Sequence, residues 1–182
     1  MESHNLRKKA LKALDETTFY PSKGKERLKS MIDTRPDWCV SRQRVWGVPL
    51  PIFVSKKTKE ILVDDDVNEN IANIYEKEGS DCWFSDDPQR FLGSKYKSDD
   101  YEKLKDIVEV WFDSGSTHSF VLEKREDLKW PASMYLEGSD QHRGWFHSSL
   151  LESCGTRGRA PFESILSHGF VVDGKGLKMS KS

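Results

Sequence analysis

Apolar residues recur at helical spacing near the start of the chain. One face of a helix predicted over residues 5–15 carries Leu6, Ala10, Leu11 and Leu14. A short extended segment at residues 19–21 leads to a second predicted helix over residues 24–32. We interpret both helices as solvated scaffold. A mitochondrial leader is the alternative for the first helix, but Glu2, Asp15 and Glu16 argue against it, because such leaders are poor in acidic residues.

After residue 106 the pattern changes to apolar runs that alternate with helical segments. Residues 107–112 and 134–136 are predicted as buried strands, and residues 165–172 form a third apolar run. A turn-and-cap signal at residues 113–116 predicts a short helix after the first strand, and a longer helix is predicted over residues 140–154 after the second. This order of strands and helices predicts an α/β fold with parallel pairing and right-handed crossovers.

The middle of the chain, residues 54–106, has a different character. It contains a predicted hairpin with its turn at Lys56–Lys59 and a predicted amphipathic helix over residues 67–78. Three aspartates at residues 64–66 could suggest a cation site, but the residues after them do not continue a calcium-loop pattern, which favours a helix cap. We interpret this segment as a peripheral α+β insertion with no chemistry of its own.

Composition narrows the class of protein. Of the 182 residues 36% are hydrophobic and 32% are charged, which is typical of a folded domain rather than a disordered segment. The net charge of -1 gives no global basic field that would by itself indicate tight nucleic-acid binding. The three cysteines form no CxxC pair, which argues against a zinc ribbon or a disulfide framework and predicts a cytoplasmic protein. No apolar run approaches the length of about 18 residues that a membrane span needs.

Polar groups gather where the second predicted strand ends, in the segment YLEGSDQHRGWF at residues 135–146. Ligands bind at the carboxyl ends of strands in open α/β sheets, because free helix N–H groups and turn backbone meet there. This segment is therefore the first candidate binding site. Its His142 and the following His147 are five residues apart and do not share a helix face, so no metal site is predicted.

Two further segments have candidate chemistry as well as a simpler explanation. In residues 38–49 two tryptophans flank Arg42 and Arg44, a pattern that can stack on bases and contact phosphates, although core tryptophans and ion-paired arginines explain it more simply. In the tail two glycines precede Lys178 and Lys181. Such a cationic loop suits a phosphate group whose charge changes during reaction, although a frayed terminus is the simpler explanation.

Together, three sequence motifs resemble those of class I aminoacyl-tRNA synthetases, and their residues are most similar to the bacterial isoleucine-specific branch. They are WCVSRQRVWGVP at residues 38–49, VWFDSGSTHS at 110–119 with YLEGSDQHRGWF at 135–146, and KMSKS at 178–182. The resemblance covers essentially the whole chain. It implies an isoleucine–tRNA ligase of protein biosynthesis, which activates isoleucine with ATP and Mg²⁺ to isoleucyl-adenylate and then transfers it to tRNA(Ile).

The catalytic domain of that family is a Rossmann-type parallel sheet split by insertions, and its first half carries a His-Ile-Gly-His-type motif that is absent here. The resemblance therefore implies an internal fragment in three parts. Residues 1–53 would be the return segment from the editing insertion, residues 54–106 a peripheral connective insertion, and residues 107–182 the second half of the catalytic domain, ending in KMSKS. Isoleucine, ATP, tRNA(Ile) and the missing N-terminal half would be its partners, with no membrane involved.

The resemblance also implies roles for individual residues. The adenylate or ATP would be contacted by Glu137, Gly138, Asp140, Gln141, His168, Gly169 and Lys181. The isoleucine side chain would lie against Trp111 and Trp145, and the catalytic residues would be Lys178 and Lys181. These lysines would stabilise the α-phosphate and the leaving pyrophosphate by charge and positioning. The amino-acid carboxylate is itself the nucleophile, so no general base is implied, and no metal ligand of the protein is implied either.

Two hypotheses of different classes follow. The first is an incomplete half of an isoleucine-activating domain, which we expect to be inactive alone because the ATP-binding motif of the other half is absent. The second is a stand-alone, non-catalytic module that binds RNA or protein and derives from a synthetase. The intact Glu137, Asp140 and Lys181 favour the first hypothesis, because a pure binding module would not need them.

Overall fold

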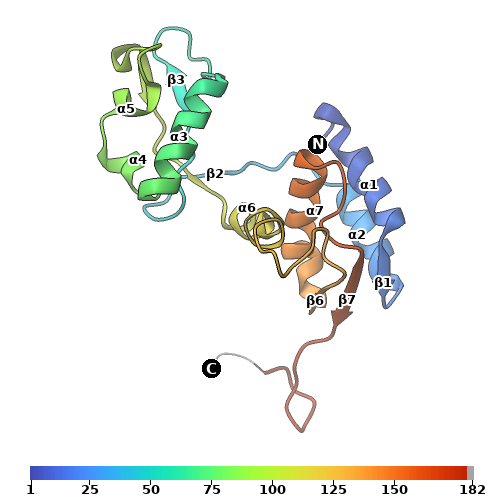
Figure 1. Ribbon diagram of the computed structural model, residues 1–182. Helices are drawn as coiled ribbons and strands as arrows, with labels where there is room; N and C mark the ends of the chain where they lie inside the picture. The colour runs from blue at the N-terminus through green and yellow to red at the C-terminus, as the bar shows by residue number, and fades with distance from the viewer. Residues whose placement is uncertain (180–182) are drawn as a thin grey trace. The chain divides into compact units, whose positions relative to one another are not determined.

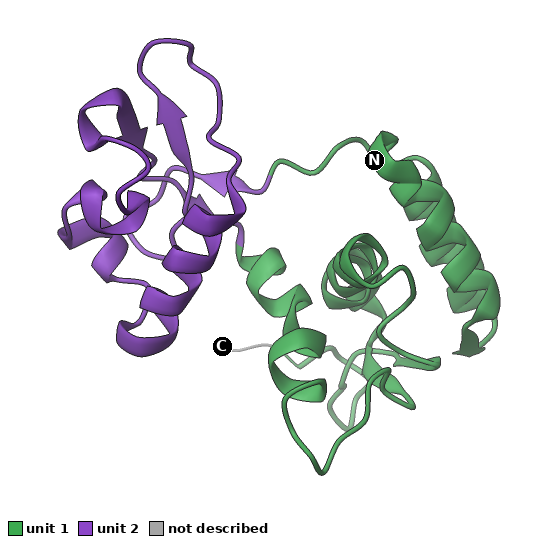
Figure 2. Cartoon of the chain, turned by 45° about the horizontal axis from the view of Figure 1, so that its top comes forward, with its two compact units in different colours: residues 1–39, 110–182 green, residues 40–109 purple. Residues whose placement is uncertain are grey.

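The computed structural model describes residues 1–179, which divide into two units (Figures 1 and 2). Unit 1 combines residues 1–39 with the described chain from residue 110 onward, and unit 2 consists of residues 40–109. None of the helices in the described residues is long and apolar enough to cross a membrane.

Unit 1 is built on a parallel sheet of three strands in the order β1–β7–β6. These strands are β1 Thr18–Tyr20, β6 Tyr135–Gly138 and β7 Ser164–His168. Ile165 of the central strand is fully buried and pairs with Phe19 on one side and with Tyr135 on the other. The parallel pairing of β6 and β7 confirms the α/β prediction. The sequence did not predict that β1 joins this sheet, because three residues carry almost no periodic signal.

Two N-terminal helices, α1 Leu6–Glu16 and α2 Lys23–Asp33, confirm the elements predicted there. Their apolar stripes are buried, however, and α1 contacts both α2 and α7 Trp145–Thr156. The core they form with α7 and the sheet includes Ala10, Leu14, Leu28, Ile32, Phe146, Leu150, Cys154, Phe162 and Ile165. The interpretation of these helices as solvated scaffold was therefore wrong, because burial of one stripe makes them part of the core.

The helix predicted over residues 140–154 is divided at Gly144. A 3₁₀ turn, η4 Ser139–Arg143, follows β6 directly, and α7 begins only at Trp145. The backbone of Gly144 has φ -118° and ψ -116°, which is not helical and separates the two segments.

The strand predicted over residues 107–112 is wrong beyond residue 108. β5 Ile107–Val108 pairs antiparallel with β2 Ser41–Arg42 in unit 2, whereas Val110–Gly115 form helix α6 in unit 1. An apolar run of this length is compatible with either a strand or a helix, so its periodicity could not decide.

Hydroxyl groups explain why residues 113–116, which were predicted to cap a new helix, instead continue the helix that begins at Val110. Ser114 Oγ donates to the carbonyl of Val110 at 3.1 Å, and Ser116 Oγ donates to that of Asp113 at 2.8 Å. Side chains that could cap a new helix thus bond to the preceding turn. The short helix predicted to end at about residue 122 is present as a π-helical turn, η3 His118–Leu122.

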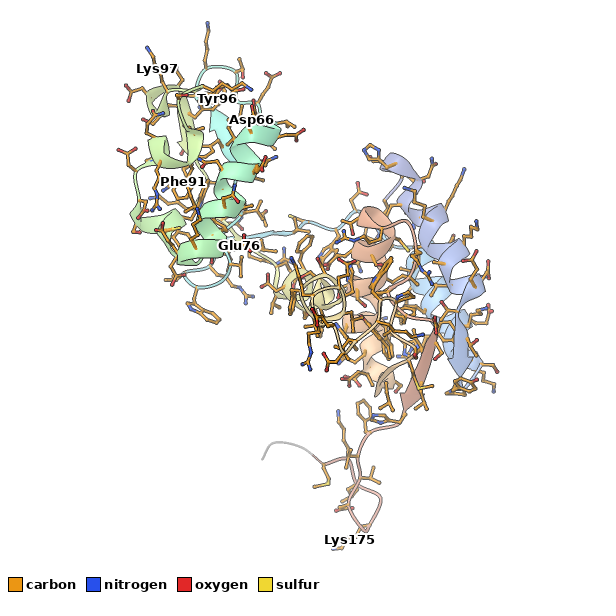
Figure 3. The ribbon with its side chains drawn as sticks, viewed as in Figure 1. Asp66, Glu76, Phe91, Tyr96, Lys97 and Lys175 are labelled. Carbon is orange, nitrogen blue, oxygen red and sulfur yellow. The ribbon has the colours of Figure 1, made fainter. Side chains whose placement is uncertain are left out.

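Unit 2 has its own hydrophobic core. β3 Phe53–Ser55 pairs antiparallel with β4 Tyr101–Lys103, and the remaining elements are α3 Asp65–Glu78, α4 Cys82–Ser85, α5 Pro88–Leu92 and the short turn η2 Ser98–Asp100. Its core consists of Phe53, Val67, Ile71, Trp83, Phe91 and Leu92, and Phe91 is labelled in Figure 3. Trp83 is fully buried, and its Nε1 donates to the carbonyl of Leu104 at 2.8 Å.

Two local predictions for this unit are confirmed. The hairpin is closed by hydrogen bonds from Ser55 N to Glu60 O at 2.9 Å and from Leu62 N to Phe53 O at 2.8 Å. Asp64 caps α3, because its carboxylate accepts from the backbone N–H groups of residues 66 and 67 at 3.0 and 3.2 Å. The unit is wider than residues 54–106, and the interpretation of that segment as a connective insertion stays a prediction.

Candidate functional site

Two parallel strands end side by side in unit 1. Glu137 and Gly138, at the end of β6, pair with Ser167 and His168 at the end of β7. The side chains of Glu137 and His168 are exposed, and η4 and α7 continue the chain from the same edge. The sheet thus places its polar strand ends where the segment 135–146 predicted a ligand site.

Gly138 permits a close approach that a side chain would prevent. A Cβ atom at this position would lie 2.5 Å from Oδ1 of Asp140 and 3.8 Å from Cε1 of His168. The carboxylate of Asp140 therefore folds back over the strand end, next to the histidine of the neighbouring strand. This geometry brings three of the predicted site residues together.

Gln141 is fixed by both atoms of its amide. Its Nε2 donates to Oδ2 of Asp140 at 3.1 Å, and its Oε1 accepts from the backbone N–H of Trp145 at 3.0 Å. The second bond satisfies a free N–H in the first turn of α7, as an N-cap does. The sequence analysis did not predict this capping bond from Gln141.

Trp111 of α6 lies over the joint between η4 and α7. A Cβ atom at Gly144 would lie 2.8 Å from Cη2 and 3.0 Å from Cζ3 of this indole, and it would be closer still to Oε1 of Gln141. The absence of a side chain at Gly144 therefore allows the indole to pack directly against the backbone at the end of η4. The side chain of Trp111 is 41% exposed, so part of it is open to a ligand.

Trp145 is held in a defined orientation at the start of α7. Its ring stacks on Tyr135 with centroids 4.0 Å apart and planes 2° apart, and its Nε1 donates to the carbonyl of Ser114 at 2.9 Å. That bond links α7 to α6, the helix that carries Trp111. The structure thus brings the two predicted pocket indoles to adjoining helices beside the strand ends.

His168 and Gly169 are both exposed at the end of β7. The Nδ1 of His168 is 2.6 Å from the carbonyl oxygen of Gly169, and it is the donor of this bond because a carbonyl can only accept. The imidazole is oriented by its own loop.

Lys178 lies in a hairpin that follows β7, with Lys175 near its tip (Figure 3). The carboxylate of Asp173 shapes the turn by accepting from the N–H groups of Lys175 and Leu177 at 2.8 and 2.9 Å. The ammonium of Lys178 lies 3.7 Å from the ring centroid of Phe170, which makes it a cation–π pair. This contact lies in the segment after β7 and not at the strand ends where Glu137, Asp140 and His168 meet. Lys181 lies outside the described residues.

His142 is a site residue that the sequence considered only as a metal ligand. It is 1% exposed, its Nδ1 donates to the carbonyl of Ser139 at 2.8 Å, and its ring meets Phe146 edge-on at 5.6 Å. The buried ring of His142 therefore packs η4 against α7. Within residues 1–179, no group of three or more His, Cys, Asp and Glu residues could hold a metal ion.

The whole chain, residues 1–182, matches the family model described as tRNA synthetases class I (I, L, M and V). It is 88% identical to the isoleucine–tRNA ligase of Pelagibacter ubique (strain HTCC1062) over 182 residues and 61% identical to that of Brucella abortus biovar 1 (strain 9-941) over 178 residues. These alignments cover 100% and 97% of this chain but 20% and 18% of the relatives, so the chain spans about a fifth of their length.

A solved structure with a similar fold is the LeuRS of Agrobacterium radiobacter K84, in a ternary complex with tRNA and LeuAMS. The TM-score is 0.52 at 22% sequence identity, and the match covers 80% of this chain and 21% of that one. This likeness supports the fold alone.

Proposed function

Because the chain belongs to the class I tRNA synthetases of the isoleucine, leucine, methionine and valine group, we propose that it is part of an isoleucine–tRNA ligase and supplies one wall of the isoleucyl-adenylate site. The observation that carries this proposal is the joint of β6, η4 and α7, where Trp111 lies over Gly144 beside the Asp140–Gln141 pair. The relatives named as isoleucine–tRNA ligases support the choice of amino acid.

The strand ends suit the polar parts of an aminoacyl-adenylate. The exposed carboxylate of Glu137 binds the α-ammonium group of isoleucine by charge. Gly138 lets the ribose approach the backbone, and the carboxylate of Asp140 accepts hydrogen bonds from the ribose hydroxyls. Gln141 contacts the carbonyl or phosphate side, while His168 and Gly169 lie beside the adenine.

The two indoles suit the apolar side chain of isoleucine. Trp145 is fixed by Tyr135 and by its bond to Ser114, so it forms a rigid wall, and the partly exposed Trp111 forms another. Isoleucine and valine differ by one methylene. A hydrophobic pocket discriminates between two such amino acids by only about 1–3 kcal/mol of binding free energy, and isoleucine synthetases are a standard example.

The hairpin after β7 supplies positive charge. In the reaction the isoleucine carboxylate attacks the α-phosphorus of ATP, a bond forms to that phosphorus, and pyrophosphate leaves with its electron pair. Lys178 and Lys181 stabilise the negative charge on the oxygens of the α-phosphate and of the leaving pyrophosphate. To do so, the ammonium of Lys178 leaves the ring of Phe170 and binds phosphate. Mg²⁺ enters with ATP, and we assign it no ligand in the described residues. The parent enzyme then transfers isoleucine to tRNA(Ile) in the cytoplasm.

A chimera tests this function directly. Residues 1–182 would replace the matching segment of the Pelagibacter ubique ligase, and isoleucine-dependent exchange between ATP and pyrophosphate would be measured. We expect exchange with isoleucine well above that with leucine, and none by the isolated 182-residue chain. A folded chimera without isoleucine-dependent exchange, or one that prefers leucine, would refute the proposal. If such an inactive chimera still bound RNA, the binding-module hypothesis would gain.

A further inference from the structure

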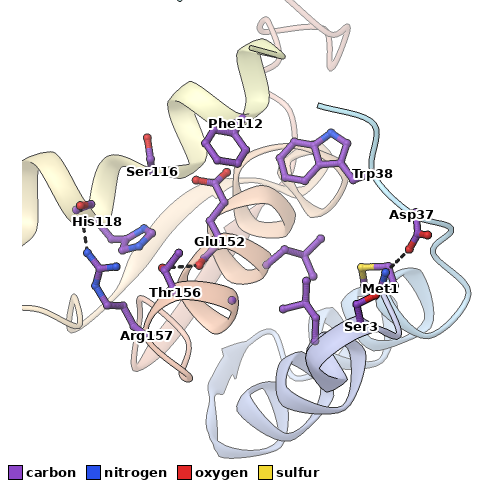
Figure 4. A pocket seen from close by; sticks show the side chains of 14 residues that line it. Met1, Ser3, Asp37, Trp38, Phe112, Ser116, His118, Glu152, Thr156 and Arg157 are labelled. Carbon is purple, nitrogen blue, oxygen red and sulfur yellow. Dashed lines mark hydrogen bonds and ion pairs between the residues drawn. The ribbon is translucent and has the colours of Figure 1, made fainter. Parts of the chain in front are cut away.

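A surface pocket in unit 2 combines basic and aromatic side chains. Its volume is about 490 Å³, close to the 540 Å³ of a pocket along α7 in unit 1 (Figure 4), and both have the size of a small-molecule site. In the pocket along α7 the guanidinium of Arg157 is already paired with the carboxylate of Glu123. The pocket in unit 2 is lined by Ser55, Lys57, Lys95, Tyr96, Lys97, Asp100 and Tyr101. None of these residues belongs to the candidate adenylate site.

The backbone that carries two of the lysines is held by hydrogen bonds. The side-chain amide of Gln89 donates to the carbonyl of Tyr96 at 2.8 Å and accepts from the N–H of residue 98 at 2.9 Å. Both peptide groups that flank Lys97 are therefore bonded. Lys57 lies in the turn of the hairpin, where the N–H of residue 58 donates to Oγ of Ser55 at 3.2 Å. A ligand would thus have to order only the two lysine side chains and not the backbone.

Two tyrosine rings form the aromatic part of the lining. Tyr96 and Tyr101 lie with their ring centroids 5.5 Å apart and their planes at 80°, and Tyr101 follows directly from β3's partner strand, where it pairs with Ser55. The hydroxyl of Tyr96 donates to Oδ2 of Asp64 at 2.7 Å, which fixes this ring. Figure 3 shows Tyr96 and Lys97 at the same end of unit 2. A flat ring of a ligand can pack against such a pair, because each tyrosine offers an apolar face or edge.

The charges of the lining that have no partner are mainly positive. The ammonium of Lys95 is paired with the carboxylate of Asp64. Within the described residues, neither the ammonium of Lys57 nor that of Lys97 has a hydrogen-bond or ion-pair partner, and both side chains are exposed. The carboxylate of Asp100 is exposed and unpaired in the same way. The pocket therefore offers two positive charges and one negative charge to a ligand.

We propose that this pocket binds a ribonucleoside phosphate, either as a free nucleotide or as one nucleotide of a single RNA strand. The phosphate would bind the ammonium groups of Lys57 and Lys97, because each is a point charge with free donors. The base would pack against Tyr101, since every base has a flat face that stacks on aromatic rings. The ribose hydroxyls would donate to the carboxylate of Asp100. The pocket lies within residues 54–106, for which the sequence predicted no chemistry, and the inference does not depend on the proposed function.

Three probes test the proposal on the 182-residue chain. They are uridine 5′-monophosphate, uridine and hexauridylate, titrated separately while backbone amide resonances are followed. Both phosphate-bearing probes should bind saturably with shifts at residues 57, 97 and 101, and uridine should bind more weakly by about tenfold or more. Per nucleotide, an affinity for hexauridylate that exceeds that for the monophosphate by about tenfold or more would identify an RNA strand as the source, and a smaller ratio a free nucleotide. The proposal would be overturned by a lack of saturable shifts in unit 2, or by uridine that binds as tightly as its monophosphate.

Matched variants separate this pocket from general attraction to positive charge. Lys97→Gln, at an exposed position, should weaken binding of the monophosphate by about threefold to fivefold. For hexauridylate it should also make the slope of log affinity against log salt concentration shallower by about 0.7, because one phosphate contact is lost. Lys77→Gln removes the same charge from an exposed position on α3 outside the pocket and should change neither value. Equal effects of Lys97→Gln and Lys77→Gln would contradict the assignment.

A third variant tests the aromatic part of the site. Tyr101→Leu should weaken binding of all three probes, uridine included, because the base loses the ring on which it stacks. Unchanged amide resonances around Trp83, in the core of unit 2, would show that the variant is folded. Full affinity for all three probes in folded Tyr101→Leu would contradict the assignment.

Discussion

Replacing Gly144 with alanine adds one methyl group where three elements of the candidate site meet. The new Cβ would lie 2.8 and 3.0 Å from two carbons of the Trp111 indole, whereas ordinary contacts begin at 3.4 Å. It would also overlap Oε1 of Gln141, the acceptor that caps the Trp145 N–H. We expect a loss of about 1–3 kcal/mol in the free energy of unfolding from overpacking. Loss of the capping bond accounts for about 1 kcal/mol of this.

Urea unfolding followed at individual amide resonances measures this effect separately for each unit. Gly144→Ala should destabilise unit 1, shift the indole resonance of Trp111 and leave unit 2 unchanged. Gly174→Ala is the matched control, because a Cβ there would have no atom within 4 Å and its φ is not positive. Equal stability of Gly144→Ala and Gly174→Ala, with an unmoved Trp111, would refute the account of how Trp111 meets η4.

Three further predictions concern stability, measured by the same urea titrations. Burial and, second, the charge of Arg35 lower the pKa of His147 from 6.5 to about 4. As the pH falls from 6.5 to 4 the unfolded chain therefore takes up a proton before the folded chain does, and the free energy of unfolding of unit 1 should fall. His147→Leu should flatten this pH dependence, and an unchanged slope would contradict the prediction. Hydrogen bonds from Lys95 and Tyr96 lower the pKa of Asp64 from 3.8 to about 2. The ionised Asp64 should therefore stabilise unit 2 fully above pH 3.8, and this stabilisation should be lost as the pH falls toward 2. Asp64→Asn keeps the helix cap but removes the charge, so it should lack this pH dependence, and equal acid sensitivity of the two proteins would count against the ion pair. Gly155→Ala, within α7, should raise the stability of unit 1 by about 0.5–1 kcal/mol, because its Cβ would lie an ordinary 3.8 Å from Leu6, and a loss would show that the contact is tighter.

The sequence predicted the elements whose periodicity is strong. The apolar stripe of α1 and the helix over most of α7 were both predicted, since repeated apolar residues at helical spacing leave little ambiguity. The burial of α1 was not predicted, because a stripe does not say which element covers it. Residues 110–112 were predicted as a strand, because valine and two aromatic residues favour strands locally, and tertiary packing turned them into helix.

The candidate site was located by its motifs, but its geometry was not. The segment 135–146 predicted a strand end with polar groups, and β6 and η4 confirm that arrangement. The contact of Trp111 with Gly144 joins residues 33 positions apart, and the partnership of β1 with β7 spans most of the chain. Neither can be inferred from local spacing, because both depend on how separate elements pack.

The most direct test of the central claim is the Michaelis constant for isoleucine in the pyrophosphate-exchange reaction of the chimera carrying Trp111→Ala. Because the indole would contact the amino-acid side chain, we expect this constant to rise by about tenfold or more while that for ATP stays unchanged. Phe120→Ala, at another exposed aromatic residue of unit 1, is the control and should change neither constant. A Trp111→Ala chimera with an unaltered constant for isoleucine would contradict the claim that this chain forms a wall of the isoleucyl-adenylate site.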